Sequence, residues 1–254
     1  MPLKEIAKIL DNAALEATPT RQVSLDTPVS LEDAYTIQKH SIERRLNRGE
    51  NLTGYKLGFT SKAKMEQMGV HELIWGRLTD QMDLSTEGSM SMHNFIHPRV
   101  EPEIAFIVSK DIDKPITREE CFEYVSAIAP AIEVIDSRYK DFKFSLEDVI
   151  ADNCSSSGYV LGELLPPDTK INDIAIEVLI NGACVQSGNT NAILGDPWES
   201  FLEATRITSK YKVPILKGMV ILAGAATSAE YVKTDDQVLC QFNNLGEVSL
   251  KVEI

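Results

Sequence analysis

Apolar and polar residues alternate with a helical period at the start of the chain. Residues 3–16 place apolar side chains three or four positions apart, and this period predicts an amphipathic helix. A second helix is predicted from Ser30, which opens a sequence resembling a capping box, to Gly49, a residue typical of helix C-termini. Neither helix offers candidate chemistry, and we expect both to pack as a cap on the rest of the chain.

From residue 52 onward the pattern favours strands. Gly54 and Gly58 lie inside the first of them, and glycine within a strand often marks the close approach of a ligand or another backbone. Asn181 and Gly182 separate two extended runs and predict a β-hairpin. Strands are expected at residues 52–60, 97–106, 131–135, 155–162, 174–180, 183–186, 219–222, 238–242 and 248–252.

Helices and loops separate these strands. Ser61 is predicted to cap a short helix over residues 62–68, and further helices are predicted after Thr117 and from Asp196. Residues 75–80 are interpreted as a loop that folds over a site. Residues 136–153 are interpreted as a long, irregular functional loop.

Two glutamates stand two residues apart in a segment predicted to be a strand. Side chains at positions i and i+2 of a strand share one face, so Glu101 and Glu103 are expected to project together. Glu133 lies in an apolar run, where an ionised carboxylate is costly unless something pairs with it. Three such groups suit a hard divalent metal such as Mg²⁺. The alternative is a solvated strand face, with Glu133 paired to Arg138.

Lys56 lies between apolar neighbours and is flanked by the two glycines of the first strand. Desolvation of a lysine there would lower its pKa and suit it to catalysis. The alternative is a lysine whose stem packs on apolar surface while its ammonium reaches water.

Net charge and cysteine spacing argue against several classes of protein. A net charge of -13 argues against a nucleic-acid partner or an anionic membrane, because both would repel the surface. The four cysteines are widely scattered, which favours reduced thiols over a disulfide scaffold or a zinc site. We find no signal-peptide pattern and no long apolar run, so a cytoplasmic location is expected.

Several catalytic motifs are absent from the sequence. There is no nucleophile elbow, phosphate-binding loop or dinucleotide-binding glycine pattern. His71, His93 and His97 are not at zinc-binding spacing, and we interpret them as surface or supporting groups. The elements together predict an α+β chain, with a helical N-terminal cap region at residues 1–94 that includes the lysine strand, and a β-rich metal-binding catalytic core at residues 95–254.

Several stretches, in the same order along nearly the whole chain, resemble the hydratase and decarboxylase branch of the fumarylacetoacetate hydrolase superfamily. The matching stretches are Gly54-Tyr55-Lys56-Leu57-Gly58-Phe59-Thr60-Ser61, Pro98-Arg99-Val100-Glu101-Pro102-Glu103-Ile104-Ala105, Ala131-Ile132-Glu133-Val134-Ile135-Asp136-Ser137-Arg138, Ala151-Asp152-Asn153-Cys154-Ser155-Ser156, Leu194-Gly195-Asp196-Pro197 and Leu222-Ala223-Gly224-Ala225. Departures from the pattern occur at Leu73, usually proline, and at Asp235, usually glycine.

The resemblance implies a helical N-terminal part on a mixed β-roll core, a homo-oligomer, and Mg²⁺ or Mn²⁺ held by the three glutamates. It also implies that Lys56 is catalytic and that Ser155, Ile74 and Thr227 bind substrate. Within the branch, the sequence is more similar to enzymes that decarboxylate 2-oxo-3-hexenedioate, a small anionic diacid from the meta-cleavage breakdown of catechols, and a complex with the pathway hydratase is a further expectation.

One position distinguishes the two activities of this branch. Hydratases of the branch typically read Pro-Asp-Phe-Gly where decarboxylases read Pro-Ile-Tyr-Gly, and this chain has Ile74 at the second place. Hydration of 2-hydroxypenta-2,4-dienoate is the same-class alternative. Acylpyruvate hydrolysis is a further option, although no His-Glu water activator is found, and a non-catalytic acidic scaffold is the alternative from another class.

Overall fold

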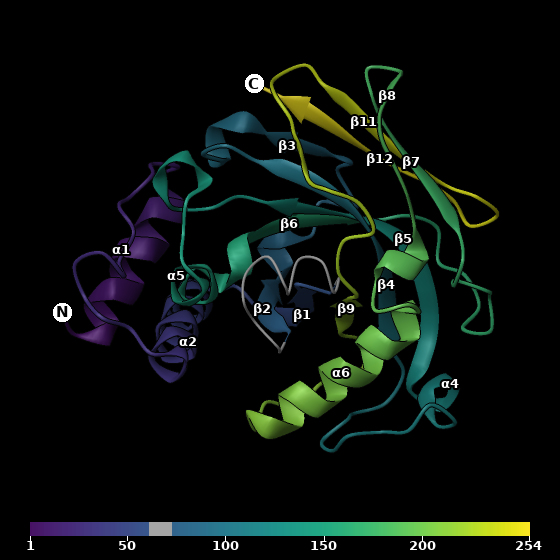
Figure 1. The fold of residues 1–254 in the computed structure, drawn as a ribbon, viewed down its shortest axis with the longest axis horizontal. Helices are drawn as coiled ribbons and strands as arrows, with labels where there is room; N and C mark the ends of the chain where they lie inside the picture. The colour runs from purple at the N-terminus through teal and green to yellow at the C-terminus, as the bar shows by residue number, and fades with distance from the viewer. Residues whose placement is uncertain (61–72) are drawn as a thin grey trace.

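The computed structural model describes residues 1–60 and 73–254, and it contains two β-sheets with helices around them (Figure 1). The strands of the larger sheet follow the order β2-β1-β9-β4-β5-β6, with β10 added against β4, and those of the smaller sheet follow β3-β12-β11-β7-β8. The strand bounds are β1 Leu52–Gly58, β2 Ile74–Thr79, β3 Ser89–Ser91, β4 Arg99–Val108, β5 Val125–Ile135, β6 Ser156–Leu161, β7 Ala175–Ile180, β8 Ala183–Asn189, β9 Val220–Leu222, β10 Glu230–Tyr231, β11 Gln237–Phe242 and β12 Gly246–Glu253.

The helices lie at two places around the sheets. In Figure 1, α1, α2 and α5 gather on one side of the molecule, whereas α6 lies beside β9 and α4. The helix bounds are α1 Leu3–Leu15, α2 Leu31–Asn47, α4 Cys121–Tyr124, α5 Leu146–Ala151 and α6 Pro197–Lys210, and the short 3-10 turns are η1 Asp80–Met82, η2 Met92–Asn94, η3 Lys140–Phe142, η4 Asn153–Ser155 and η5 Thr190–Ala192. This mixture of helix and sheet confirms the predicted α+β class.

The two N-terminal helices form where the apolar period predicts them, and they do more than cover the core. Ser30 and Asp33 form a complete capping box at the start of α2. From the middle of that helix the fully buried amide of Gln38 donates to the carbonyl oxygens of Trp75 (2.9 Å) and Ile150 (3.1 Å). The cap therefore ties strand β2 to helix α5.

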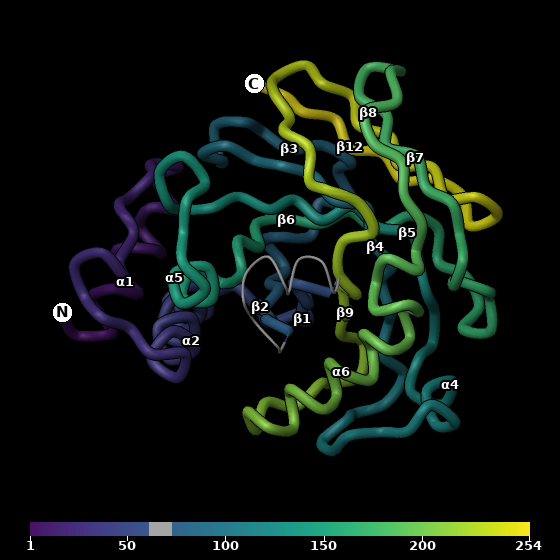
Figure 2. The backbone as a smooth tube through the Cα atoms, viewed as in Figure 1, coloured from purple at the N-terminus to yellow at the C-terminus, as the bar shows by residue number. Residues whose placement is uncertain are grey.

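The pairing of β4 with β5 organises the larger sheet, and the two strands run side by side in Figure 2. Their antiparallel register places Glu101 opposite Glu133. On β4, alternate residues such as Ile104 and Phe106 enter the main hydrophobic core, where Phe106 packs 5.0 Å from the ring of Phe201 in α6. The glutamates lie on the opposite face, beside small residues such as Ala105.

Three of the predicted elements differ in the structure. Residues 75–80, interpreted as a loop, belong mostly to β2, whose six residues are all buried, so neither face shows the polar alternation of a half-exposed strand. Residues 136–153, interpreted as irregular, contain α5, which starts with a capping box at Ser145. The helix predicted after Thr117 is a single turn, α4.

Some expectations are not addressed by the described residues. The helix predicted over residues 62–68, with its cap Ser61, and the residue His71 lie outside them. The division into residues 1–94 and 95–254 stays a prediction, although β1 and β2 share one sheet with β4 and β5. Within the part of the chain that is described, no helix has both the length and the apolar character needed to cross a membrane.

Candidate active site

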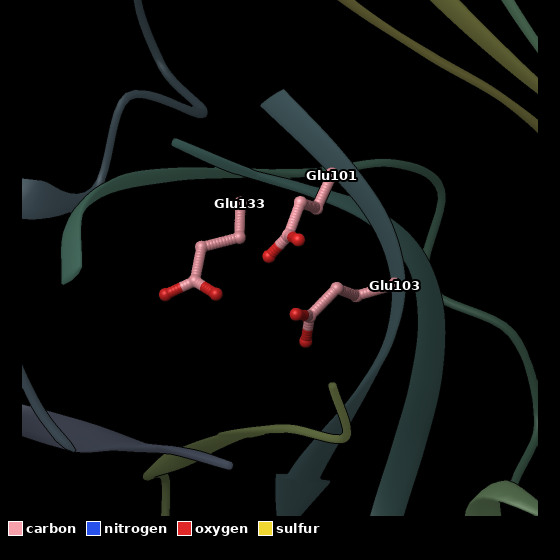
Figure 3. A group of neighbouring side chains, drawn as sticks. All are labelled: Glu101, Glu103 and Glu133. Carbon is pink, nitrogen blue, oxygen red and sulfur yellow. The ribbon is translucent and has the colours of Figure 1, made fainter. Parts of the chain in front are cut away.

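Three buried carboxylates meet on the inner face of the larger sheet. One oxygen from each of Glu101, Glu103 and Glu133 lies within 4.8 Å of the others, and the three side chains point toward one another in Figure 3. Glu103 and Glu133 are fully buried and Glu101 is 7% exposed. The predicted convergence of the three side chains is confirmed, and the solvated-face alternative is wrong.

The protein supplies little compensation for these charges. Glu103 Oε2 accepts a hydrogen bond from the backbone N–H of Gly224 at 2.7 Å. Glu103 Oε1 and Glu133 Oε1 are buried and accept no hydrogen bond from any described residue. Burial, together with the neighbouring Glu133 carboxylate, raises the pKa of Glu103 well above its usual range, and burial also raises the pKa of Glu133. Glu103 and Glu133 are thus short of positive charge within the part of the chain that the structure describes.

Lys56 of β1 supplies the one cation seen in contact with the cluster among the described residues. Its Nζ lies 2.9 Å from Glu133 Oε2 and donates to the Cys154 carbonyl at 3.3 Å. The side chain is 4% exposed, so the alternative of an ammonium reaching water is wrong. Burial lowers the pKa of Lys56, but the charges of Glu133 and Glu103 outweigh it and the pKa is raised overall. The expectation of a lowered pKa is therefore wrong.

The alternative in which Glu133 pairs with Arg138 is also wrong, because the partners of Arg138 lie elsewhere. Its guanidinium forms a buried ion pair with Asp152 and donates to the carbonyl oxygen of Asp136 at 2.7 Å. These contacts hold the segment that leads into the turn carrying Ser155.

That turn has an unusual backbone. Asn153, Cys154 and Ser155 all have positive φ angles (51°, 53° and 59°), a conformation that costs energy for residues other than glycine. The side chain of Asn153 offsets part of this cost, since its Oδ1 accepts from Arg77 N and its Nδ2 donates to Arg77 O, both at 2.8 Å. The strained turn brings the Cys154 carbonyl to Lys56.

A cavity of about 370 Å³ opens beside this constellation. Its lining includes Lys56, Glu101, Ile74 and Ser155, so the structure brings these predicted site residues together. Ser155 Oγ is buried and has no hydrogen-bond partner among the described residues. Thr227 is not part of this lining, although the next two residues are, and its substrate contact stays a prediction.

Sequence reasoning assigned no role to several residues of the cavity. Phe59, Phe144 and Val149 make one side of it apolar, and Arg99 adds a second cation. Arg99 could have been identified from the sequence as a site residue, because it stands two residues before Glu101 and so shares its face of β4. The aromatic residues could not have been identified in this way, since they lie in loops whose folding over the site depends on tertiary packing.

The donor set fits a divalent cation. Carboxylate oxygens are the ligands that Mg²⁺ and Mn²⁺ prefer, and oxygens without partners are available on Glu103 and Glu133. Glu103 and Glu133 are both fully buried and lie beside the ammonium of Lys56, and a dication would balance the negative charge that this ammonium leaves. The structure therefore supports the expectation of a metal site at the three glutamates.

Comparison with known proteins agrees with this geometry. A "4-oxalocrotonate decarboxylase" of Pseudomonas sp. is 43% identical over 249 residues, covering 98% of this chain and 97% of the relative. A "2-keto-4-pentenoate hydratase" of Paraburkholderia xenovorans (strain LB400) is 31% identical, covering 98% of this chain and 94% of the relative. The solved structure of 4-oxalocrotonate decarboxylase from Pseudomonas putida G7, complexed with magnesium and adipate, superimposes with a TM-score of 0.94 at 30% identity and covers 98% of this chain and 97% of that chain.

The family match covers more than half of the chain. Residues 84–253 match the family described as "Fumarylacetoacetate (FAA) hydrolase C-terminal", a range that holds all three glutamates and Ser155 but begins after Lys56. The close superposition on a solved member also confirms the predicted type of fold. The chain belongs to the fumarylacetoacetate hydrolase family.

Proposed function

We propose that this chain is a divalent-metal-dependent decarboxylase that converts 2-oxo-3-hexenedioate (4-oxalocrotonate) to 2-hydroxypenta-2,4-dienoate and CO₂ in the meta-cleavage breakdown of aromatic compounds. The observation that carries the proposal is the buried cluster of three carboxylates, with Lys56 beside it, at the wall of a cavity. The similarity to 4-oxalocrotonate decarboxylases over almost the whole chain supports the same reaction.

Glu101, Glu103 and Glu133 would hold Mg²⁺ or Mn²⁺. When bound, such an ion supplies Lewis-acid stabilisation of the negative charge that develops on the C2 oxygen of the substrate. The unpartnered oxygens of Glu103 and Glu133 support this assignment, because buried carboxylate oxygens without a partner are costly.

In the reaction, the bond between C5 and the C6 carboxylate breaks, CO₂ leaves, and the electron pair is delocalised to the C2 oxygen. Lys56 donates a hydrogen bond to that oxygen as its charge grows, and its ammonium supplies the proton that turns the dienolate into the dienol. The raised pKa of Lys56, caused by Glu133 and Glu103 in spite of burial, supports the donor role because it keeps the ammonium charged. Ser155, with its hydroxyl unpartnered, donates to a carboxylate oxygen of the substrate.

The composition of the cavity favours decarboxylation over hydration. Addition of water to the dienol needs a group that activates water, and a carboxylate serves that purpose. Apart from Glu101, no carboxylate of a described residue lines the cavity. Ile74, 5% exposed, lines it instead and keeps that wall apolar. The relationship to 2-keto-4-pentenoate hydratase nevertheless makes hydration the alternative to test.

The deciding experiment is incubation of the purified protein with 2-oxo-3-hexenedioate and Mg²⁺ while CO₂ release is followed. We expect CO₂ release that stops when a chelator is added, and almost no hydration of the dienol offered separately. Rapid conversion of the dienol to 4-hydroxy-2-oxopentanoate without CO₂ release from the diacid would assign the chain to the hydratases.

A second measurement tests whether the site is catalytic at all. Oxalate mimics the dienolate, so we expect it to raise the melting temperature only in the presence of the metal. A non-catalytic acidic scaffold would show no such dependence.

The assembly and location of the protein complete the proposal. We propose a cytoplasmic homo-oligomer that associates with the pathway hydratase, as the resemblance to this branch of the family implies. Sedimentation of the purified protein, alone and mixed with such a hydratase, tests both parts.

A further inference from the structure

The cavity beside the carboxylate cluster contains a second cationic side chain, Arg99. This residue begins β4, and strand alternation puts it on the face that carries Glu101 and Glu103. At a rise of about 3.4 Å per residue, its Cα lies about 7 Å along the strand from that of Glu101. Arg99 lines the cavity together with Glu101 and Lys56, so β4 brings both a carboxylate and a guanidinium to the same cavity.

Aromatic contacts position the guanidinium of Arg99. Its Cζ lies 4.1 Å from the ring centre of Phe142 and 3.9 Å from that of Tyr231, and a terminal nitrogen donates to the Tyr231 hydroxyl. A guanidinium donates hydrogen bonds from its edge, so stacking against rings does not consume its donors. The rings restrict the side chain and leave donors free for an anion.

Arg99 lines the cavity without a carboxylate partner among the described residues, whereas two other buried cations have one. Lys56 pairs with Glu133, and Arg138 pairs with Asp152. Arg99 forms no such ion pair, and its Nε is buried without a hydrogen-bond partner in the part of the chain that is described. A desolvated donor of this kind is costly unless a ligand supplies the acceptor.

From this geometry we propose that Arg99 binds the substrate carboxylate remote from the glutamate cluster, and so selects diacids over monoacids. The inference rests on the proposed function, which puts the 2-oxo acid end of the substrate at the cluster. In an extended six-carbon diacid, the two carboxyl carbons are about 6–7 Å apart, from five bonds of about 1.5 Å. That distance between the carboxyl carbons is close to the distance of about 7 Å between the Cα atoms of Arg99 and Glu101 along the strand.

The chemistry of the reaction determines how Arg99 acts. The remote carboxylate is the one lost, and its charge disappears as CO₂ forms. A cation that holds it therefore stabilises the bound substrate at least as much as the transition state, and contributes to binding and orientation rather than to the rate of bond breaking. Arg99→Met should raise KM by roughly tenfold or more, the usual effect of losing a charge-assisted hydrogen bond, with kcat changed less than about threefold.

Equilibrium binding in Mg²⁺ tests the proposal without turnover. 2-Oxoadipate and 2-oxohexanoate have the same chain and the same 2-oxo acid end, and they differ in the remote carboxylate. We expect wild-type protein to bind the diacid at least about tenfold more tightly, and Arg99→Met to remove this preference while it keeps its affinity for the monoacid. Arg118→Met is the matched control, because Arg118 also stacks on an aromatic ring (5.2 Å from Trp198) but lies outside the cavity lining.

The possible results separate this inference from the proposed function. An unchanged preference in Arg99→Met would overturn it, and so would an equal loss of affinity for both acids. If Arg99→Met does not fold, the wild type is titrated with the 6-amide of 2-oxoadipate, and an affinity equal to that of the diacid also overturns the inference. Failure of both acids to bind wild-type protein in Mg²⁺ contradicts the proposed function itself. Equal, metal-dependent binding of both acids to wild-type protein overturns the inference about Arg99 but does not contradict the proposed function.

Discussion

Replacement of Lys56 by methionine should sharply reduce turnover and at the same time tighten metal binding. The methionine keeps the apolar stem but removes the ammonium that lies 2.9 Å from Glu133 Oε2. An ion held by the same carboxylate would lie about 2.1 Å from its ligand oxygen, so the ammonium and a dication would be roughly 5 Å apart. At an effective dielectric constant of about 20, a single and a double positive charge at that distance repel each other by about 6–7 kcal/mol.

The measurable gain in affinity is smaller than this repulsion. The metal-free variant retains three buried carboxylates without their ammonium, and protons taken up there compete with the metal. At pH 8.5, where fewer protons bind, we expect at least about tenfold tighter binding of Mn²⁺ or Mg²⁺, about 1.4 kcal/mol. Turnover should fall by ~10² or more, typical of the loss of one positioned proton donor.

Isothermal titration of chelator-treated protein with metal gives the affinity, and CO₂ release gives the rate. Lys110→Met removes an exposed ammonium that pairs with Glu123 at 3.2 Å, and it should change neither quantity. Weaker or unchanged metal binding in Lys56→Met would refute the idea that the ammonium and the ion share Glu133. Near-normal turnover would refute a catalytic role for Lys56.

Three further sets of substitutions test the metal ligands, the cavity wall and the packing around the site. Replacing any one of the three glutamates by glutamine should abolish metal-dependent CO₂ release with an unchanged circular dichroism spectrum, and full activity of the triple variant in chelator would move the metal elsewhere. Ile74→Asp should sharply reduce decarboxylation because a fixed carboxylate repels the substrate's own charge, whereas Ile74→Leu should retain it. Gly76→Ala places a Cβ 2.6 Å from the carbonyl oxygen of Asn153 and should destabilise the protein by about 1–3 kcal/mol in urea. In Gly158→Ala the nearest atom to the new Cβ is the flexible end of Leu84 at 3.0 Å, so this variant should be destabilised less. Equal urea midpoints for the two variants would contradict the clash at Gly76.

The carboxylate cluster was predictable from the sequence because it depends on local rules. Alternation along one strand places Glu101 beside Glu103, and the apolar run around Glu133 shows that this carboxylate is buried. The partner of Glu133 was not predictable in the same way. Lys56 comes from β1, which is separated from β5 by more than sixty residues, and strand propensities do not state which strands pair.

Other features of the structure that we did not predict from the sequence have equally specific causes. Strand β2 is buried on both faces and so lacks the alternation that marks a half-exposed strand. Helix α5 is only six residues long, but its capping box at Ser145 and Asp148 is present in the sequence and would have predicted its start. The left-handed backbone at residues 153–155 has only a weak sequence signal, since none of the three residues is glycine and only Asn153 is of a type that often adopts it.

The pairing of β1 with β9 has a consequence for how the protein is made. Lys56 is in register with Leu222. One of the two neighbours of β1 in the sheet is therefore a segment more than 160 residues later in the chain. Parallel pairings of such high sequence separation form late and slowly, because closing the long intervening loop costs entropy before any contact between the strands stabilises the pair. During synthesis, β1 therefore leaves the ribosome long before the neighbour that covers its edge. We expect nascent chains that stop before β9 to lack an assembled site and to present that open strand edge to chaperones and to other nascent chains.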